Sequence, residues 1–260
     1  MLRTAFATLA LLFGTLVFGS LVLLAQLFGA DHRPGSVFER APVWWAGWLL
    51  RAAGVKVVLH GGDELQDRKP RVYVANHTSW FDIPALFDVL PHFGFLAKRE
   101  LEGIPLFGSA ARAVGVIYVD RENRKAAFSA IDDAADKVRA GQSVVVYPEG
   151  TRGMRYALRP FKKGAFVLAI RSGAPVVPVV IYGTIAVSPR GEFRASPGIV
   201  HVHVLEPVET QGLSYDERDG LSETIRLRMA SCLREVYGVE AGLEPRMAPR
   251  AATASPELSM

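Results

Sequence analysis

The sequence predicts an α/β protein with a mixed, largely parallel sheet flanked by helices, preceded by an N-terminal pair of membrane-associated helices. Short apolar segments alternate along the chain with segments of helical periodicity, which is typical of layered α/β folds. Two of the short segments, SVVVY and PVVPVVIY, are apolar at nearly every position. Such runs indicate strands that are buried on both faces of a sheet. The third observation is a long uncharged run near the N-terminus.

That uncharged run covers residues 4–30. About 20 apolar residues suffice to cross a bilayer as a helix. A secretory signal is the alternative, but its apolar core is usually about 7–15 residues long, so we expect a retained membrane anchor. Whether this helix spans the bilayer or re-enters it stays open.

Residues 36–54 combine clustered tryptophans with flanking arginines, a pattern that favours a helix at the membrane interface. The alternative is an amphipathic helix packed on the protein core. The residues that carry this pattern are Trp44, Trp45, Trp48, Arg40 and Arg51.

From residue 55 onward, strand and helix patterns follow one another. Strands are expected at residues 55–61, 71–76, 93–101, 116–121, 143–150, 175–183 and 198–208. Helices are expected at residues 79–90, 104–115, 124–140, 161–173 and 214–237. The last segment is rich in Pro and Ala and is expected to be disordered. The predicted organisation is therefore an N-terminal membrane segment (1–55), an α/β domain (56–238) and a disordered tail (239–260).

The composition of the chain, and the absence of several well-known motifs, argue against some classes of protein. The net charge of +4 suits nucleic acid, anionic lipid or phosphorylated substrates. The single cysteine, Cys232, excludes an intramolecular disulfide, and its apolar helical setting favours an inert core residue. His201 and His203 share a strand face but have no evident third ligand, so no metal site is predicted. The chain lacks G-x-G-x-x-G, Walker and G-x-S-x-G motifs, which argues against dinucleotide enzymes, P-loop ATPases and the common serine hydrolases.

Charged and polar residues follow several of the predicted strands. Ligands of open α/β sheets bind beyond the carboxyl ends of the strands, so parallel neighbouring strands would bring these residues to one rim. The residues are His77, Lys98-Arg99-Glu100, Asp120-Arg121 and Glu149-Gly150-Thr151-Arg152.

Each of these residues also has a structural interpretation. A single His at a strand end is often structural, and Ser79 and Asp82 fit the S-x-x-D pattern of a helix capping box. Arg121 and Arg152 could form surface ion pairs. Both interpretations of Asp82 are compatible, because a helix that begins near Ser79 would place Asp82 beside His77.

Taken together, four blocks resemble the 1-acylglycerol-3-phosphate acyltransferase family. They are NHTSWFD, with His and Asp separated by four residues, then GVIYVDR, YPEGTR and VVPVVI, in this order. The resemblance covers about residues 70–185. The apolar N-terminus is also similar to the membrane-docking helices of bacterial members. One position departs from the pattern, since Tyr118 stands where many relatives have Phe.

The resemblance implies a glycerolphosphate acyltransferase-like fold and a catalytic role for the domain over residues 56–238. It implies transfer of an acyl chain from acyl-CoA or acyl carrier protein to the sn-2 hydroxyl of 1-acylglycerol 3-phosphate (lysophosphatidic acid), which forms phosphatidic acid. His77 would be the general base and Asp82 its orienting partner. This fits the residue types, because neutral imidazole accepts protons near pH 7 and a carboxylate fixes its tautomer.

The resemblance also implies a substrate-binding set. Arginine matches a phosphate with two parallel hydrogen bonds, glycine lets the backbone approach a ligand, and Glu149 either binds a glycerol hydroxyl or holds an arginine. The set is Lys98, Arg121, Glu149, Gly150, Thr151 and Arg152.

Membrane lipid is the expected partner, on the cytoplasmic face of the inner membrane, and no cofactor, metal or nucleic acid is expected. Two alternatives stay open: the same acyl transfer to another lyso-lipid (a lyso-aminolipid or a lysophospholipid), and a non-catalytic protein that binds anionic lipid.

Overall fold

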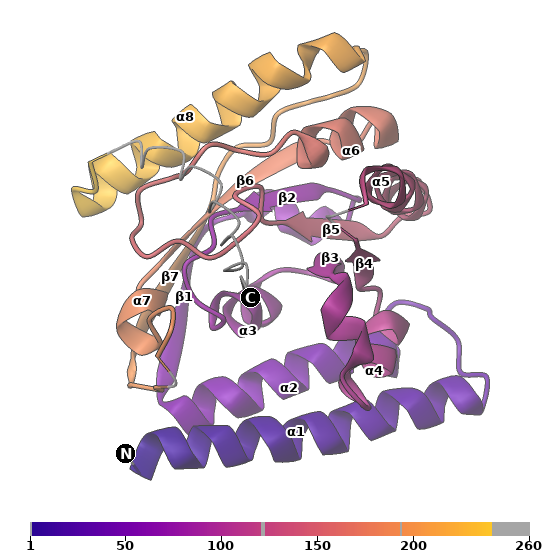
Figure 1. Ribbon diagram of the computed structural model, residues 1–260, viewed down its shortest axis with the longest axis vertical. Helices are drawn as coiled ribbons and strands as arrows, with labels where there is room; N and C mark the ends of the chain where they lie inside the picture. The colour runs from indigo at the N-terminus through magenta and orange to yellow at the C-terminus, as the bar shows by residue number, and fades with distance from the viewer. Residues whose placement is uncertain (1, 121–122, 193, 241–260) are drawn as a thin grey trace, which may run out of the picture.

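The computed structural model describes residues 2–120, 123–192 and 194–240. Within these residues the strands form a seven-stranded sheet in the order β1-β7-β6-β2-β5-β3-β4 (Figure 1). Only the β6–β7 pair is antiparallel among the described strand pairs, which confirms the predicted mixed, largely parallel sheet. The strands are β1 (Val55–Gly61), β2 (Val72–Ala75), β3 (Phe93–Lys98), β4 (Ile117–Val119), β5 (Ser143–Val146), β6 (Val176–Tyr182) and β7 (Gly198–Val204).

Helices cover both faces of the sheet (Figure 1). The helices are α1 (Leu2–Leu27), α2 (Val37–Ala53), α3 (Asp82–Val89), α4 (Phe107–Ala113), α5 (Arg124–Arg139), α6 (Gly164–Ser172), α7 (Thr184–Val187) and α8 (Arg218–Tyr237). Short 3-10 turns are η1 (Asp63–Asp67), η2 (Arg99–Gly103) and η3 (Tyr215–Glu217). Helices α5, α6 and α8 lie on one face, whereas α2 and α3 lie on the other, with α1 outside α2 (Figure 1).

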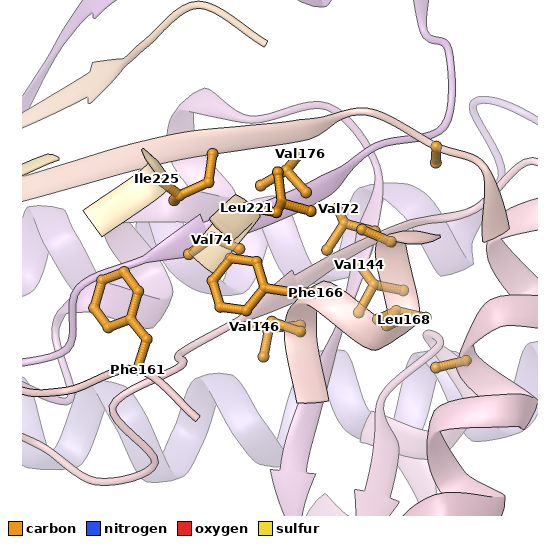
Figure 2. Close-up of a cluster of buried hydrophobic side chains, with 14 of the residues drawn as sticks. Val72, Val74, Val144, Val146, Phe161, Phe166, Leu168, Val176, Leu221 and Ile225 are labelled. Atoms are coloured by element: carbon orange, nitrogen blue, oxygen red, sulfur yellow. The ribbon is translucent and has the colours of Figure 1, made fainter. Parts of the chain in front are cut away.

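The central strands are apolar at successive positions because each face of the sheet has its own core. On the α6 and α8 side, Val72 and Val144 pack with Phe166 (Figure 2). The residues between them, Tyr73 and Val145, point to the opposite face and join the core beneath α2 and α3. Burial of both alternating sets explains the runs that lack the usual polar alternation.

Helices α1 and α2 are tied together by the tryptophans of α2. The Trp45 indole Nε1 donates to Thr15 Oγ1 at 3.1 Å, and the Trp48 Nε1 donates to the Ala10 carbonyl at 3.0 Å. Gly14 makes room for this contact, because a Cβ there would lie 3.1 Å from Trp48 Cδ1. Two of the three predicted interfacial tryptophans therefore hold α1 against α2.

The outer side of α1 is a row of exposed apolar side chains. The helix is long and apolar enough to cross a membrane by length and composition. Its exposed large residues include Phe6, Leu9, Leu12, Phe13, Leu16, Val17, Leu21 and Leu24. The division into membrane segment and catalytic domain stays a prediction, and residues 241–260 of the predicted tail lie outside the described residues.

One helix begins later than expected. The pattern predicts a helix over 79–90, whereas α3 starts at Asp82. The amides of Thr78 and Ser79 donate to the Asp82 side chain, so these residues form a turn ahead of the helix. Pro84 then occupies the first helical turn, where its missing N–H is tolerated.

Candidate active site

The carboxyl ends of four adjacent parallel strands form the rim that the sequence predicts. His77 follows β2, Glu149 follows β5, Lys98 ends β3 and Asp120 follows β4, and these strands are neighbours in that order. Lys98 is exposed and lies two strands away from β2, about 10 Å along the sheet. Arg121, the other predicted cation at the β4 end, lies outside the described residues.

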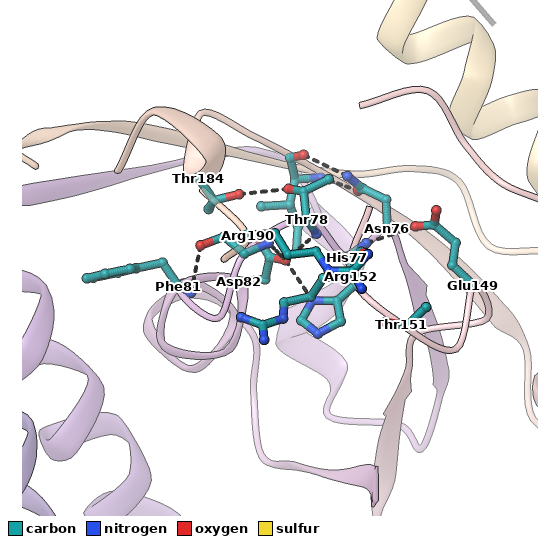
Figure 3. A network of polar contacts seen from close by, with 12 residues as sticks. Asn76, His77, Thr78, Phe81, Asp82, Glu149, Thr151, Arg152, Thr184 and Arg190 are labelled. Atoms are coloured by element: carbon teal, nitrogen blue, oxygen red, sulfur yellow. Dashed lines mark hydrogen bonds and ion pairs between the residues drawn. The ribbon is translucent and has the colours of Figure 1, made fainter. Parts of the chain in front are cut away.

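His77 and Asp82 form a hydrogen-bonded pair. The His77 Nδ1 lies 2.7 Å from Asp82 Oδ2 (Figure 3), and the Asp82 side chain is fully buried. The same oxygen accepts the amides of Thr78 at 2.8 Å and Ser79 at 2.9 Å. Three N–H donors therefore fix the carboxylate that orients the imidazole.

The capping interpretation of Ser79 and Asp82 holds in part. Asp82 accepts the Ser79 amide, as the acidic residue of a capping box does. The Ser79 hydroxyl, however, donates to the Ser188 carbonyl at 2.7 Å and accepts the Phe81 amide at 3.2 Å. The turn thus serves as a helix start and as the support of the His77–Asp82 pair.

Asn76 and Thr78 attach this turn to the neighbouring strand β6. The Asn76 Nδ2 donates to the Ile181 carbonyl at 2.9 Å, and its Oδ1 accepts the Ile181 amide at 2.7 Å. The Thr78 and Thr184 hydroxyls share a hydrogen bond of 3.1 Å (Figure 3). Sequence reasoning did not select either residue, although both lie inside the NHTSWFD block.

The Glu149 carboxylate accepts hydrogen bonds from His77 and Arg159. Its Oε1 accepts the His77 amide at 3.0 Å, and its Oε2 accepts the Arg159 amide at 3.2 Å and the Arg159 Nε at 3.4 Å. Burial raises the pKa of Glu149, while the hydrogen bonds from His77 and Arg159 oppose that rise. Of the two predicted roles, the structure shows the arginine-holding one, and the arginine is Arg159, which sequence reasoning missed.

The residues after Glu149 fold back toward His77. Gly150 has a φ of 75°, a left-handed backbone conformation that favours glycine. The exposed Thr151 offers its carbonyl to the Arg159 guanidinium. The Gly153 amide donates to the His77 carbonyl at 2.7 Å and closes the loop over the site.

Two arginines belong to the loops around His77, since Arg152 precedes Gly153, whose amide donates to the His77 carbonyl. Arg152 comes from the loop after β5, and Arg190 comes from the loop after α7 (Figure 3). The Arg190 Nη1 donates to the Arg152 carbonyl at 2.6 Å. No strand-end signal marks Arg190, so only the tertiary structure identifies it. The rim therefore combines an oriented imidazole with cations, an arrangement that can deprotonate a hydroxyl and hold an anion.

Comparisons with known proteins agree with this chemistry. A family model described as Acyltransferase matches residues 56–182. The chain is 35% identical over 185 residues to the sheep 1-acyl-sn-glycerol-3-phosphate acyltransferase alpha, covering 70% of this chain and 64% of that relative. It is 33% identical over 220 residues to the Saccharomyces cerevisiae 1-acyl-sn-glycerol-3-phosphate acyltransferase, covering 82% and 71% of the two chains.

A solved structure gives the same result for the fold. The crystal structure of the 1-acyl-sn-glycerophosphate (LPA) acyltransferase PlsC from Thermotoga maritima superposes with a TM-score of 0.75 at 25% identity, over 95% of this chain and 99% of that one. The chain belongs to the 1-acyl-sn-glycerol-3-phosphate acyltransferase family. It spans slightly less than two thirds of the length of the sheep and mouse relatives.

Proposed function

We propose that this protein transfers an acyl chain from a thioester to the sn-2 hydroxyl of 1-acylglycerol 3-phosphate, forming phosphatidic acid. The observation that carries the proposal is the 2.7 Å contact between His77 Nδ1 and Asp82 Oδ2. Because the carboxylate accepts a hydrogen bond from Nδ1–H, the lone pair of the neutral ring lies on Nε2. The relatives are named for the acceptor 1-acyl-sn-glycerol 3-phosphate, and the cations of the site suit its phosphate.

In the proposed reaction, His77 Nε2 takes the proton of the sn-2 hydroxyl as that oxygen attacks the thioester carbonyl. The new C–O bond forms, the C–S bond breaks, and the imidazolium returns its proton to the departing thiolate. Asp82 stabilises the transient imidazolium and holds the ring. The acceptor's own hydroxyl is the nucleophile, so the reaction needs no acyl-enzyme.

The acceptor phosphate would be bound by the cations of the rim. Arg152 and Arg190 come from the loops around His77, and Figure 3 draws both in the same network as that residue. Their guanidinium groups can each form two parallel hydrogen bonds to phosphate oxygens. Lys98 would contribute from the end of β3, and Arg121 is proposed from the sequence alone. Both acyl-CoA and acyl carrier protein fit as donors.

The membrane would supply the acceptor and receive the product. The exposed apolar side of α1 provides a surface that lipid would cover, on the cytoplasmic face of the inner membrane. The other lyso-lipid acceptors differ in headgroup, and the arginines of the loops around His77 favour a phosphate monoester over a neutral headgroup.

The test is donor and acceptor profiling of the purified, detergent-solubilised protein. Acyl-CoA and acyl carrier protein thioesters are each combined with 1-acylglycerol 3-phosphate, a lysophospholipid and a lyso-aminolipid. We expect thioester consumption to be fastest with the phosphate monoester, and His77→Ala to lower kcat by about 10²- to 10⁴-fold. Preference for another acceptor would select the alternative transfer, and no thioester consumption with any pair would select the lipid-binding alternative.

The same assay examines the phosphate-binding arginines. Arg152→Ala and Arg190→Ala should raise the acceptor KM more than the donor KM, and Arg152→Lys should restore binding only in part because lysine lacks the forked donor geometry. Arg234→Ala, an exposed arginine on α8, is the matched control. Equal effects on both substrates would move the phosphate site elsewhere.

A further inference from the structure

The aromatic ring of Tyr147 stacks on the His77 imidazole. Their ring centroids lie 4.0 Å apart and their planes differ by 15°. The register of the sheet produces this contact, because Val74 of β2 lies opposite Val146 of β5. Tyr147 is the first residue after β5, and His77 is the second after β2, so the two rings meet just beyond the strand ends.

Tyr147 is itself supported from the other side. Strand β5 lies between β2 and β3, so Tyr147 lies between His77 and Phe95 of β3. Tyr147 and Phe95 stack with centroids 5.8 Å apart and planes 16° apart, and Phe95 in turn contacts Phe93 edge to face at 5.0 Å. Phe95 is 5% exposed. This aromatic row joins the core beneath α3 and fixes the ring that touches the imidazole.

The hydroxyl of Tyr147 does not take part in the hydrogen-bond network around His77. Its oxygen is buried and has no hydrogen-bond partner among the described residues. Burial, and to a lesser extent the nearby Asp82 charge, raise the pKa of Tyr147 well above its ordinary value, so the phenol stays neutral. The part of Tyr147 that acts on His77 is therefore the ring face.

We propose that Tyr147 is a positioning residue whose ring face holds the His77 imidazole and stabilises the imidazolium formed during acyl transfer. An aromatic face attracts a cation within about 6 Å of its centroid. The 4.0 Å stack lies inside this limit. The inference deepens the proposed function and rests on His77 acting as the base.

The two carboxylates near His77 contact it at positions other than the face of the imidazole that stacks on Tyr147. Asp82 reaches the ring in its plane through Nδ1, and Glu149 binds the backbone amide of His77. The Asp82 carboxylate therefore stabilises the imidazolium in the plane of the ring, and the Tyr147 ring stabilises it from one face.

The experiment compares Tyr147→Phe with Tyr147→Leu in the full-length enzyme. Phe keeps the ring face and removes the unpaired hydroxyl, so kcat should stay within about twofold of wild type. Leu removes the ring, and kcat should fall by about 2- to 30-fold, the range that cation–π energies give. The acceptor KM should change by less than about twofold, because Tyr147 is placed against the base and the phosphate against the arginines.

The pH profile separates this role from simple packing. Losing an interaction that favours the protonated ring favours the neutral ring, so the acid limb of kcat/KM should move to lower pH in Tyr147→Leu and stay in place in Tyr147→Phe. Phe166→Leu is the matched control, since it removes a buried aromatic ring from the core on the other face of the sheet, away from Tyr147 and His77. That variant should lose thermal stability while keeping the acid limb in place.

A shape-preserving series keeps the inference testable if Tyr147→Leu fails to fold. Phenylalanine analogues with an increasing number of ring fluorines at position 147 retain the ring and weaken the negative face, so kcat should fall stepwise with fluorination. Unchanged kcat across the series, or an unmoved acid limb in a folded Tyr147→Leu enzyme, would overturn the inference alone. Wild-type activity in His77→Ala would overturn the proposed function as well.

Discussion

Asp82 both stabilises the turn at Thr78 and Ser79 and orients the imidazole of His77. Its Oδ2 accepts from His77 Nδ1 and from the Thr78 and Ser79 amides, while its side chain is fully buried. Replacing this carboxylate therefore affects charge and structure, and two substitutions can separate these contributions. An asparagine carbonyl can still accept the backbone amides, whereas an alanine leaves them without that acceptor.

We expect Asp82→Asn to fold normally and to lose about 10²- to 10⁴-fold in kcat, because a neutral amide cannot stabilise the imidazolium. Asp82→Ala should lose comparable activity and also about 1–3 kcal/mol of unfolding free energy for each amide left unpaired. Steady-state kinetics and chemical denaturation measure the two effects. Wild-type kcat in a well-folded Asp82→Asn protein would contradict the proposed role of Asp82.

At the scale of single residues, the sequence predicts contacts between residues that are close together in the chain. His77 and Asp82 are five residues apart, and a single turn brings them together. Tyr147 contacts His77, and Arg190 contacts Arg152, from segments distant in the sequence, so these contacts follow from the strand order and the path of the loops. Tyr147 lies in the YPEGTR block, yet its sequence position gives no sign that its ring stacks on the imidazole.

At the scale of elements, β1 and β7 present a cluster of histidines away from the site. His60 Nε2 lies 2.9 Å from His201 Nδ1, and the His60 ring stacks on His203 with centroids 4.2 Å apart. His203 Nε2 in turn lies 2.6 Å from the hydroxyl of Tyr237, the last residue of α8. Burial, with the neighbouring histidines, lowers the pKa of His203 to about 4. Among the described residues, no group of three or more His, Cys, Asp or Glu is arranged to hold a metal ion.

This lowered pKa predicts a loss of stability in acid. Between the unfolded value of about 6.5 and the folded value, the unfolded chain binds a proton at His203 that the folded protein does not, so stability falls as the pH drops through this window. His203 is partly exposed, which reduces its contribution to about 1–2 kcal/mol. Below the folded value of about 4, this contribution no longer changes with pH.

His203→Gln keeps a polar partner for Tyr237 and cannot titrate. Denaturant unfolding at pH 7.5 and pH 4.5 should therefore show a smaller acid loss in this variant than in wild type. Far-UV circular dichroism at both pH values checks that the fold is retained. An identical loss in the two proteins would show that other groups determine the acid sensitivity.

At the scale of the whole molecule, α1 lies along the α/β part of the chain. It packs on α2 and on α4, where Gly19 faces Leu106 so closely that a Cβ would lie 3.3 Å from Leu106 Cγ. Its other side exposes large apolar residues along the length of the helix. The domain and the proposed lipid-facing surface are therefore held in one orientation, with the His77 rim fixed relative to both.

We expect the double substitution Leu12→Glu and Leu16→Glu to lower activity on a bilayer-embedded acceptor by at least about tenfold, since burying each leucine in lipid contributes about 1.5–3 kcal/mol. Activity on a short-chain, water-soluble acceptor should change little, because both side chains are exposed. The matched control is Leu227→Glu with Val236→Glu on α8, which are similarly exposed. Equal loss on both acceptors would show that α1 supports the fold instead of the membrane contact.

The sequence by itself determined the α/β class, the order of strands and helices, the long apolar helix and the local His77–Asp82 pair. These features depend on hydrophobic periodicity and on contacts between residues a few positions apart, and both can be recognised within a short stretch of sequence. The tertiary structure decided that Trp45 and Trp48 hold α1 and that Glu149 holds Arg159. Such contacts depend on which elements become neighbours in space, and the strand order β2-β5-β3 is set by packing of the whole domain.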